Sequence, residues 1–184
     1  MTPTLLIVHS SGPVKPKHAA WYVLSLLALA NFLHYANRNV VVTMYDDLRG
    51  AFDFSNSELG LLTTVFMLSH APATVLFGWL SDRMDRRHVL ALGLVIWSAA
   101  SLLCGVVGGV GSMLAARAIV GIGTAACVPV ANALICEYMP ASSKARAVSV
   151  FNLGLFLGGA SGTVVGQSLG FPSAFILLGA PGFA

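Results

Sequence analysis

The sequence predicts an all-α integral membrane protein with five complete membrane-spanning helices and an incomplete sixth. Of its 184 residues, 57% are hydrophobic and only 9% are charged, and the mean hydropathy is +0.82. A soluble domain carries about 25% charged residues, so a soluble globular enzyme is excluded. The apolar residues form long runs between short polar turns, and at about 20 residues per span the chain has room for five or six spans.

The spans follow a mixed tail over residues 1–20, in which we find no convincing signal peptide. Trp21 and Tyr22 open the first span and suit the membrane interface. The stretch from Met44 to Ser57 holds three aspartates and one arginine and is predicted to be a loop. The expected transmembrane domain covers residues 21–184, with spans at about 21–42, 58–80, 89–107, 112–136 and 147–169, and an incomplete one at 173–184.

The last apolar run holds only 12 residues. A helix of this length cannot cross a hydrocarbon core of about 30 Å at about 1.5 Å per residue. We therefore expect a fragment of a longer chain. The alternative is that another molecule completes the last helix.

Lysine and arginine are distributed unequally between the two sides of the membrane. Seven lie in the tail, the Ser81–His88 turn or the Tyr138–Arg146 turn, whereas the loops on the other side hold only Arg49. Positive charge favours the cytoplasmic side, so we expect a multi-pass protein of the inner (plasma) membrane with a cytoplasmic N-terminus. The seven are Lys15, Lys17, Arg83, Arg86, Arg87, Lys144 and Arg146.

The turn after the second span has the sequence Gly78-Trp-Leu-Ser-Asp82-Arg83-Met-Asp85-Arg86-Arg87. It resembles the signature of the major facilitator superfamily, which lies between that family's second and third helices. We expect Gly78 to allow close helix packing and Asp82 to cap a helix N-terminus. Gly78, Asp82, Arg83, Arg86 and Arg87 would form a cytoplasmic gate, whereas the alternative is an ordinary positively charged loop.

Two further segments are similar to the spinster-like and organic-anion branches of that superfamily. They are Tyr35-Ala-Asn37-Arg38 in the first span and Arg117-Ala-Ile-Val-Gly121-Ile-Gly123-Thr124 in the fourth. The resemblance covers about residues 20–184 and implies the N-terminal six-helix half of a twelve-helix transporter. Asn37 and Thr124 stand where that family commonly has Asp and Glu, so proton coupling through those acids does not carry over.

Polar side chains at membrane depth are costly and usually face a cavity. Asn31, His34, Tyr35 and Arg38 share one face of the first span, and Arg117 and Thr124 share one face of the fourth. No Asp or Glu lies deep enough in a span to neutralise Arg38 and Arg117. Because a guanidinium suits carboxylate or phosphate, we expect a small organic anion or an anionic amphiphile as substrate. The alternative is that both arginines extend to the outer interface.

His34 and His70 are the deep side chains that titrate near neutral pH, so they are candidates for a proton relay. The alternative is that they are hydrogen-bonding packing residues. In the fifth span, Gly154, Gly158, Gly162 and Gly166 form a strip on which another helix can pack closely.

The predicted function is a secondary active transporter that works by alternating access. We expect no enzyme activity, no metal, no cofactor and no nucleic-acid partner; the expected partners are the lipid bilayer, the anion, and a missing C-terminal half or a second copy. One alternative is a six-helix scaffold that dimerises or does not transport. An intramembrane protease acting through Ser161 is disfavoured, because every histidine precedes that serine.

Overall fold

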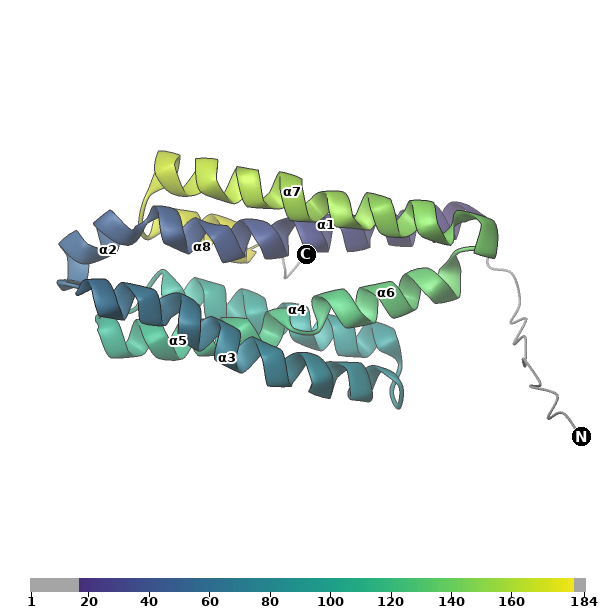
Figure 1. The fold of residues 1–184 in the computed structure, drawn as a ribbon, viewed down its shortest axis with the longest axis horizontal. Coiled ribbons are helices and arrows are strands. Elements are labelled where there is room, and N and C mark those ends of the chain that lie inside the picture. Colours follow the sequence, from purple (N-terminus) through teal and green to yellow (C-terminus); the bar gives the residue numbers. More distant parts are fainter. Residues whose placement is uncertain (1–16, 181–184) are drawn as a thin grey trace, which may run out of the picture.

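The computed structural model describes residues 17–180, and the regular elements within that range are all helical. They form an elongated bundle whose long helices run along one axis (Figure 1). Between residues 17 and 180, five segments are long and apolar enough to cross a membrane. Residues 1–16 and 181–184 lie outside the described range, so the expectations for most of the tail and for the end of the sixth span do too. The elements are α1 (Lys17–Thr43), α2 (Tyr45–Phe52), α3 (Asn56–Ser81), α4 (Arg86–Cys104), α5 (Val110–Thr124), α6 (Cys127–Tyr138), η1 (Ala141–Ser143), α7 (Lys144–Leu169) and α8 (Ser173–Gly179).

Helices α1 and α7 lie side by side along most of their length (Figure 1). Four of the glycines of α7 are buried in this contact, namely Gly154, Gly158, Gly162 and Gly166. A Cβ at Gly154 would lie 2.9 Å from the backbone nitrogen of Phe32, and one at Gly162 would lie closer still to the carbonyl oxygen of Ala36. The two backbones therefore approach so closely that only glycine fits on the α7 side.

The stretch from Met44 to Ser57, predicted as a loop, contains the helix α2, and that prediction was wrong. Met44 and Leu48 are fully buried, and they lie one helical turn apart. The first turn of α2 contains two aspartates, which favour a helix N-terminus because they complement its dipole. The stretch was predicted as a loop because it holds several charged residues, but most of these lie in a short amphipathic helix at one end of the bundle (Figure 1).

Helix α3 begins with a complete capping box at Ser55. The Ser55 hydroxyl accepts a hydrogen bond from the backbone nitrogen of Glu58 at 3.3 Å, and the Glu58 carboxylate accepts one from the Ser55 backbone at 2.9 Å. Two backbone donors are thereby satisfied at the helix start.

Replacing Ser55 with alanine is expected to lower the free energy of unfolding by about 1 kcal/mol, because the first turn of α3 loses its cap. Thermal unfolding in lipid nanodiscs measures the change. Ser57→Ala is the matched control, because Ser57 is exposed in the same turn. Equal effects of the two substitutions would contradict the role of the cap.

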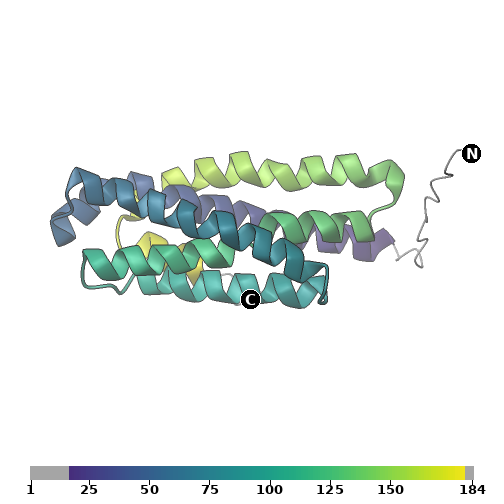
Figure 2. The ribbon, with the colours of Figure 1, turned by 60° about the horizontal axis from the view of Figure 1, so that its bottom comes forward.

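The fourth predicted span, expected as one helix over 112–136, is divided into α5 and α6 at Ala125 and Ala126. Pro129 explains the break, because proline donates no hydrogen bond to the carbonyl four residues earlier and its ring crowds that carbonyl. The backbone nitrogen of Ala125 donates instead to Ile122 at 3.2 Å. The two helices follow one another along the bundle (Figure 2).

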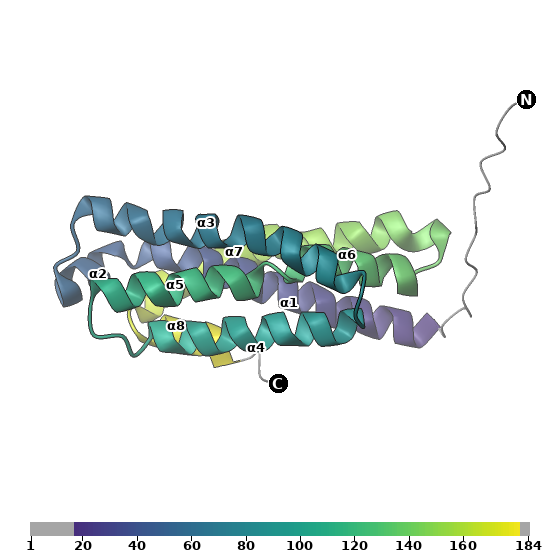
Figure 3. The ribbon, with the colours of Figure 1, turned by 90° about the horizontal axis from the view of Figure 1, so that it is seen from below.

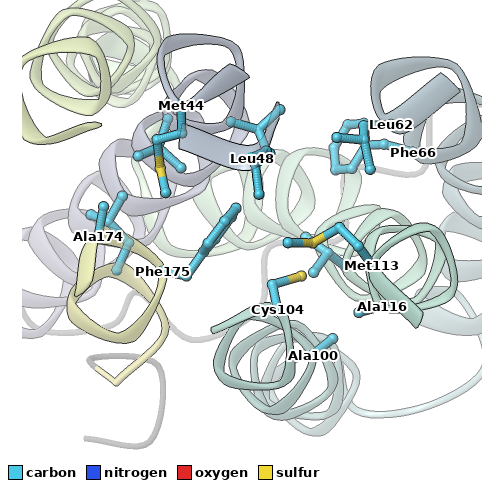
Figure 4. Close-up of a cluster of buried hydrophobic side chains, with 14 of the residues drawn as sticks. Met44, Leu48, Leu62, Phe66, Ala100, Cys104, Met113, Ala116, Ala174 and Phe175 are labelled. Atoms are coloured by element: carbon cyan, nitrogen blue, oxygen red, sulfur yellow. The ribbon is translucent and has the colours of Figure 1, made fainter. Parts of the chain in front are cut away.

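A cluster of buried apolar side chains joins α1, α2, α3, α4, α5 and α8 at the α2 end of the bundle. Phe175 of α8 extends into the cluster toward Leu48 of α2, and Cys104 of α4, Met113 of α5 and Phe66 of α3 lie around them (Figure 4). Helix α4 contacts both α5 and α8 (Figure 3). The short helices α2 and α8 thus close this end of the bundle over the site described next.

Candidate functional site

The two membrane-embedded arginines meet at one aromatic ring. The guanidinium carbon of Arg38, on α1, lies 5.9 Å from the centre of the Phe66 ring on α3. The guanidinium carbon of Arg117, on α5, lies 5.6 Å from the same centre. Both distances suit a cation–π contact. The packing therefore brings together two cations that lie 79 positions apart in the sequence.

Arg117 is buried among apolar side chains and leaves hydrogen-bond donors unused. Its side chain is only 2% exposed. A second ring, Phe175 of α8, lies 5.6 Å from its guanidinium carbon. Neither Nε nor Nη1 has a hydrogen-bond partner within residues 17–180. Arg117 therefore does not extend to the interface in this conformation, and its unused donors point to a missing acceptor.

Arg38 is partly exposed and is held only weakly by the protein. Its Nη2 donates to the sulfur of Met67 at 3.9 Å. In the part of the chain that the structure describes, no ion pair joins Arg38 or Arg117 to a carboxylate. The two arginines that lack acidic partners in the spans therefore lie close together, beside the ring of Phe66.

The two candidate relay histidines belong to the same cluster. The His70 ring stacks on Phe66 at a centroid distance of 5.5 Å and meets His34 edge-on at 6.0 Å. His34 in turn stacks on Tyr35 at 4.7 Å. His70 Nδ1 lies 3.2 Å from the Gly121 carbonyl oxygen and 3.3 Å from the Thr124 hydroxyl. Five of the six predicted substrate-binding residues are thereby linked through Phe66 and His70.

The sixth, Asn31, is engaged elsewhere. Its amide nitrogen donates to the Phe151 carbonyl oxygen of α7 at 2.7 Å, so this side chain ties α1 to α7. Asn37 likewise donates to the hydroxyl of Ser101 on α4 at 2.8 Å. Both side chains therefore lie in contacts between helices.

The charged turn after α3 forms a network that reaches α6. Arg86 lies 3.7 Å from the Asp82 carboxylate and 3.3 Å from that of Glu137. Arg87 bonds to the hydroxyl of Tyr138, and the guanidinium carbon of Arg83 lies 3.9 Å from the centre of the Trp79 ring. A groove of about 420 Å³ lies between this turn and α6. The turn thus links the start of α4 to the end of α6.

Two details of this turn differ from the sequence-based expectation. The residue that caps the N-terminus of α4 is Asp85, whose carboxylate accepts from the Arg87 backbone nitrogen at 2.9 Å, whereas Asp82 ends α3. A Cβ at Gly78 would meet no atom within 4 Å among the described residues, so Gly78 makes no close helix contact there. Asp82 cannot cap α4 because it directly follows the last residue of α3, whereas Asp85 directly precedes the first residue of α4.

Ser161, the serine of the disfavoured protease alternative, is bonded within its own helix. Its hydroxyl donates to the Leu157 carbonyl oxygen at 2.7 Å. Ser161 is therefore an ordinary small residue of α7.

Comparison with known protein families identifies the family of this chain. The family model of the Major Facilitator Superfamily matches residues 27–184. The chain belongs to this superfamily. The sequence resemblance to it is therefore confirmed, as is the all-helical membrane fold.

Individual facilitator proteins match most of this chain. Protein spinster of Drosophila melanogaster is 31% identical over 80% of the chain, and the sphingosine-1-phosphate transporter SPNS2 of Xenopus tropicalis is 30% identical over 87%. A probable sulfoacetate transporter, SauU, of Cupriavidus necator is 28% identical over 91%. These relatives are transporters and not enzymes.

A solved facilitator structure superposes on this fold. The crystal structure of a bacterial homologue of the human lysosomal transporter spinster, in an inward-facing and unoccupied conformation, matches 91% of the chain with a TM-score of 0.85 and 26% identity. The chain spans 42% of that structure, and 24% of the fly protein, 32% of SPNS2 and 39% of SauU. It thus corresponds to less than half of each facilitator protein named.

Sequence reasoning missed the aromatic half of this facilitator site. Phe66 and Phe175 contact the arginines, yet each lies in an apolar run in which phenylalanine carries no special signal. Their role follows only from the side chains that they face. Pro129 is a sequence signal for the break after Thr124, because proline interrupts a helix in the turn that precedes it.

Proposed function

We propose that this chain forms one wall of a secondary active transporter for a small organic anion or an anionic amphiphile. Arg38 and Arg117 bind the anionic group, and His34, Tyr35 and Thr124 line the site. The observation that carries the proposal is the convergence of both guanidinium groups on Phe66, with no carboxylate paired to either within residues 17–180.

The energetic argument concerns the unpaired charge of Arg117. Removing a charged group from water costs several kcal/mol unless it is paired and hydrogen-bonded. Arg117 is 2% exposed, and two of its nitrogens lack acceptors. A bound carboxylate, phosphate or sulfonate supplies both the opposite charge and the acceptor oxygens, in the geometry that a guanidinium prefers.

The names of two relatives support the same class of substrate. Sulfoacetate carries a sulfonate and a carboxylate, and sphingosine-1-phosphate carries a phosphate on an apolar chain. Both molecules present the oxygens that paired arginines bind. The site proposed here therefore recognises the anionic group, whatever the remainder of the substrate.

Alternating access requires a second wall around a site near the membrane midplane. We propose that a C-terminal six-helix half, or a second copy of this unit, supplies that wall. The protein would lie in the inner (plasma) membrane with its N-terminus in the cytoplasm. The network of Asp82, Arg83, Arg86 and Arg87 would then latch the cytoplasmic ends of the helices.

Sulfoacetate binding to the chain in nanodiscs, measured by titration calorimetry, tests this proposal. We expect wild-type binding to weaken about tenfold in Arg38→Gln, because one charge-assisted contact of roughly 1.5 kcal/mol is lost. Arg49→Gln is the control, since Arg49 is exposed and donates a hydrogen bond to Asn56 at the start of α3. Uptake of labelled sulfoacetate into proteoliposomes, using the protein encoded by the native gene, then tests transport. Absence of binding to wild type, or equal binding by Arg38→Gln, would contradict the proposal.

A further inference from the structure

The end of α5 presents the backbone carbonyl of Gly121 to His70. Because the helix breaks after Thr124, the Ala125 nitrogen bonds to Ile122 and leaves the Gly121 carbonyl oxygen available. That oxygen lies 3.2 Å from His70 Nδ1. The last carbonyls of a helix carry partial negative charge, equivalent to about half an elementary charge, which favours a cation beside them. The break between α5 and α6 (Figure 2) therefore places a hydrogen-bond acceptor beside Nδ1 of His70.

The hydrogen bonds to His70 decide which ring nitrogen carries its proton. A carbonyl oxygen only accepts, so Nδ1 must donate to Gly121. The Thr124 hydroxyl directs its own proton to the Val120 carbonyl at 2.9 Å or to that of Gly121 at 3.1 Å, so its oxygen also accepts from Nδ1. Nε2 is then the basic nitrogen. It has no hydrogen bond to the described residues, and the His70 side chain is partly exposed.

The charges that face His70 are positive. No Asp or Glu side chain is paired with the cluster within residues 17–180. A proton on Nε2 therefore adds a third cation beside two guanidinium groups, which is unfavourable until an anion is bound. The titratable or charged side chains on the elements packed against this part of α3 are His34, Tyr35 and Arg38 on α1, Cys104 on α4, Arg117 on α5 and Cys127 on α6.

We propose that His70 binds, through Nε2, the proton that accompanies the anion, so that proton and anion enter the site together. This inference rests on the anion site described above. By linkage, an anion that favours protonation of His70 must itself bind more tightly at lower pH, by the same factor. The result is proton–anion symport through a residue of α3, in a chain that has Asn37 and Thr124 instead of carboxylates.

His34 is a poorer candidate for the same task. It is only 1% exposed, and neither of its ring nitrogens has a hydrogen-bond partner in the described part of the chain. A protonated His34 would therefore have no acceptor among the described residues for either of its N–H groups. His34 therefore serves as the comparison in the experiment.

Calorimetry of sulfoacetate binding to the nanodisc-embedded chain, in buffers with different ionisation enthalpies, counts the protons taken up with the anion. In wild type we expect net proton uptake near pH 6.5 and a gain in affinity of at least about fivefold between pH 7.5 and 5.5. His70→Gln is expected to bind sulfoacetate with no proton uptake and less than a twofold change over that range. His88→Gln, at the exposed turn, should behave as wild type. His34→Gln alters the lining of the site, so its affinity for sulfoacetate can change, but it should still take up protons with the anion.

The outcomes separate the two proposals. Sulfoacetate binding without proton uptake in wild type, or uptake that persists in His70→Gln, overturns the role of His70 and leaves the anion site standing. If proton uptake is lost in His34→Gln but kept in His70→Gln, the proton belongs to His34, and the proposed role of His70 is overturned. Failure of wild type to bind any sulfoacetate overturns the anion site, and the coupling with it. Histidine nitrogen NMR adds an independent measurement, because loss of the Nδ1–H tautomer at His70 would also contradict the mechanism.

Discussion

Replacing Arg117 with methionine is expected to stabilise the chain while removing anion binding. Methionine has a similar length and no charge, and the surrounding rings of Phe66 and Phe175 are apolar. An unpaired buried charge is costly, so its removal should raise the free energy of unfolding by about 1–4 kcal/mol. The same change removes the buried cation that meets the anion, which should cost about 3 kcal/mol of binding, or roughly a hundredfold in affinity.

The opposite signs of these two effects make the experiment informative. Thermal unfolding without sulfoacetate measures stability, and calorimetry measures affinity. Arg146→Met is the matched control, because Arg146 is exposed at the other end of the bundle. If Arg117 only supports the fold, its substitution would lower stability and leave affinity for sulfoacetate near the wild-type value.

Replacing Gly162 with valine is expected to separate α7 from α1. A Cβ at this position would overlap the backbone of Ala36, with the Cα of that residue only 2.7 Å away. A backbone cannot move aside as a flexible side chain does, so the helices must part along the contact. Overpacking of this kind costs about 3 kcal/mol, which lowers the unfolding temperature by about 6–12 °C in a chain of this size.

The control for this substitution lies on the same helix. Ala160→Val adds similar volume at an exposed position of α7, and its unfolding temperature should match that of wild type. Thermal unfolding in nanodiscs compares the two variants. A Gly162→Val chain as stable as wild type would mean that the α1–α7 contact is looser than its geometry indicates.

Some helices of this chain could be predicted from its sequence, and others could not. Long spans were predictable because a membrane helix needs about 20 consecutive apolar residues, a property of local composition. Helix α2 was missed because eight residues with several charges fit a loop and a short amphipathic helix equally well. The cap at Asp85 was missed because Asp82 and Asp85 both suit a helix start, and only the observed turn distinguishes them.

The candidate site was predictable only in part. The excess of cations over acids at membrane depth is visible in the sequence, since it requires only a count of residues within spans. The assignment of Asn31 to the substrate site depended on a shared helix face, but that side chain bonds to Phe151 of α7. Helical periodicity states which side chains point the same way and not which neighbour they meet.

The sequence by itself determined that this chain is a multi-helix membrane protein of the facilitator type, with two arginines that lack acidic partners. Hydropathy and charge are sums over neighbouring residues, so they need no knowledge of packing. Only the tertiary structure decided that Arg38, His70 and Arg117 share one aromatic cluster around Phe66, and that the end of α5 faces His70. These contacts join three helices that are distant in the chain, and close packing of their side chains, rather than local composition, selects which faces meet.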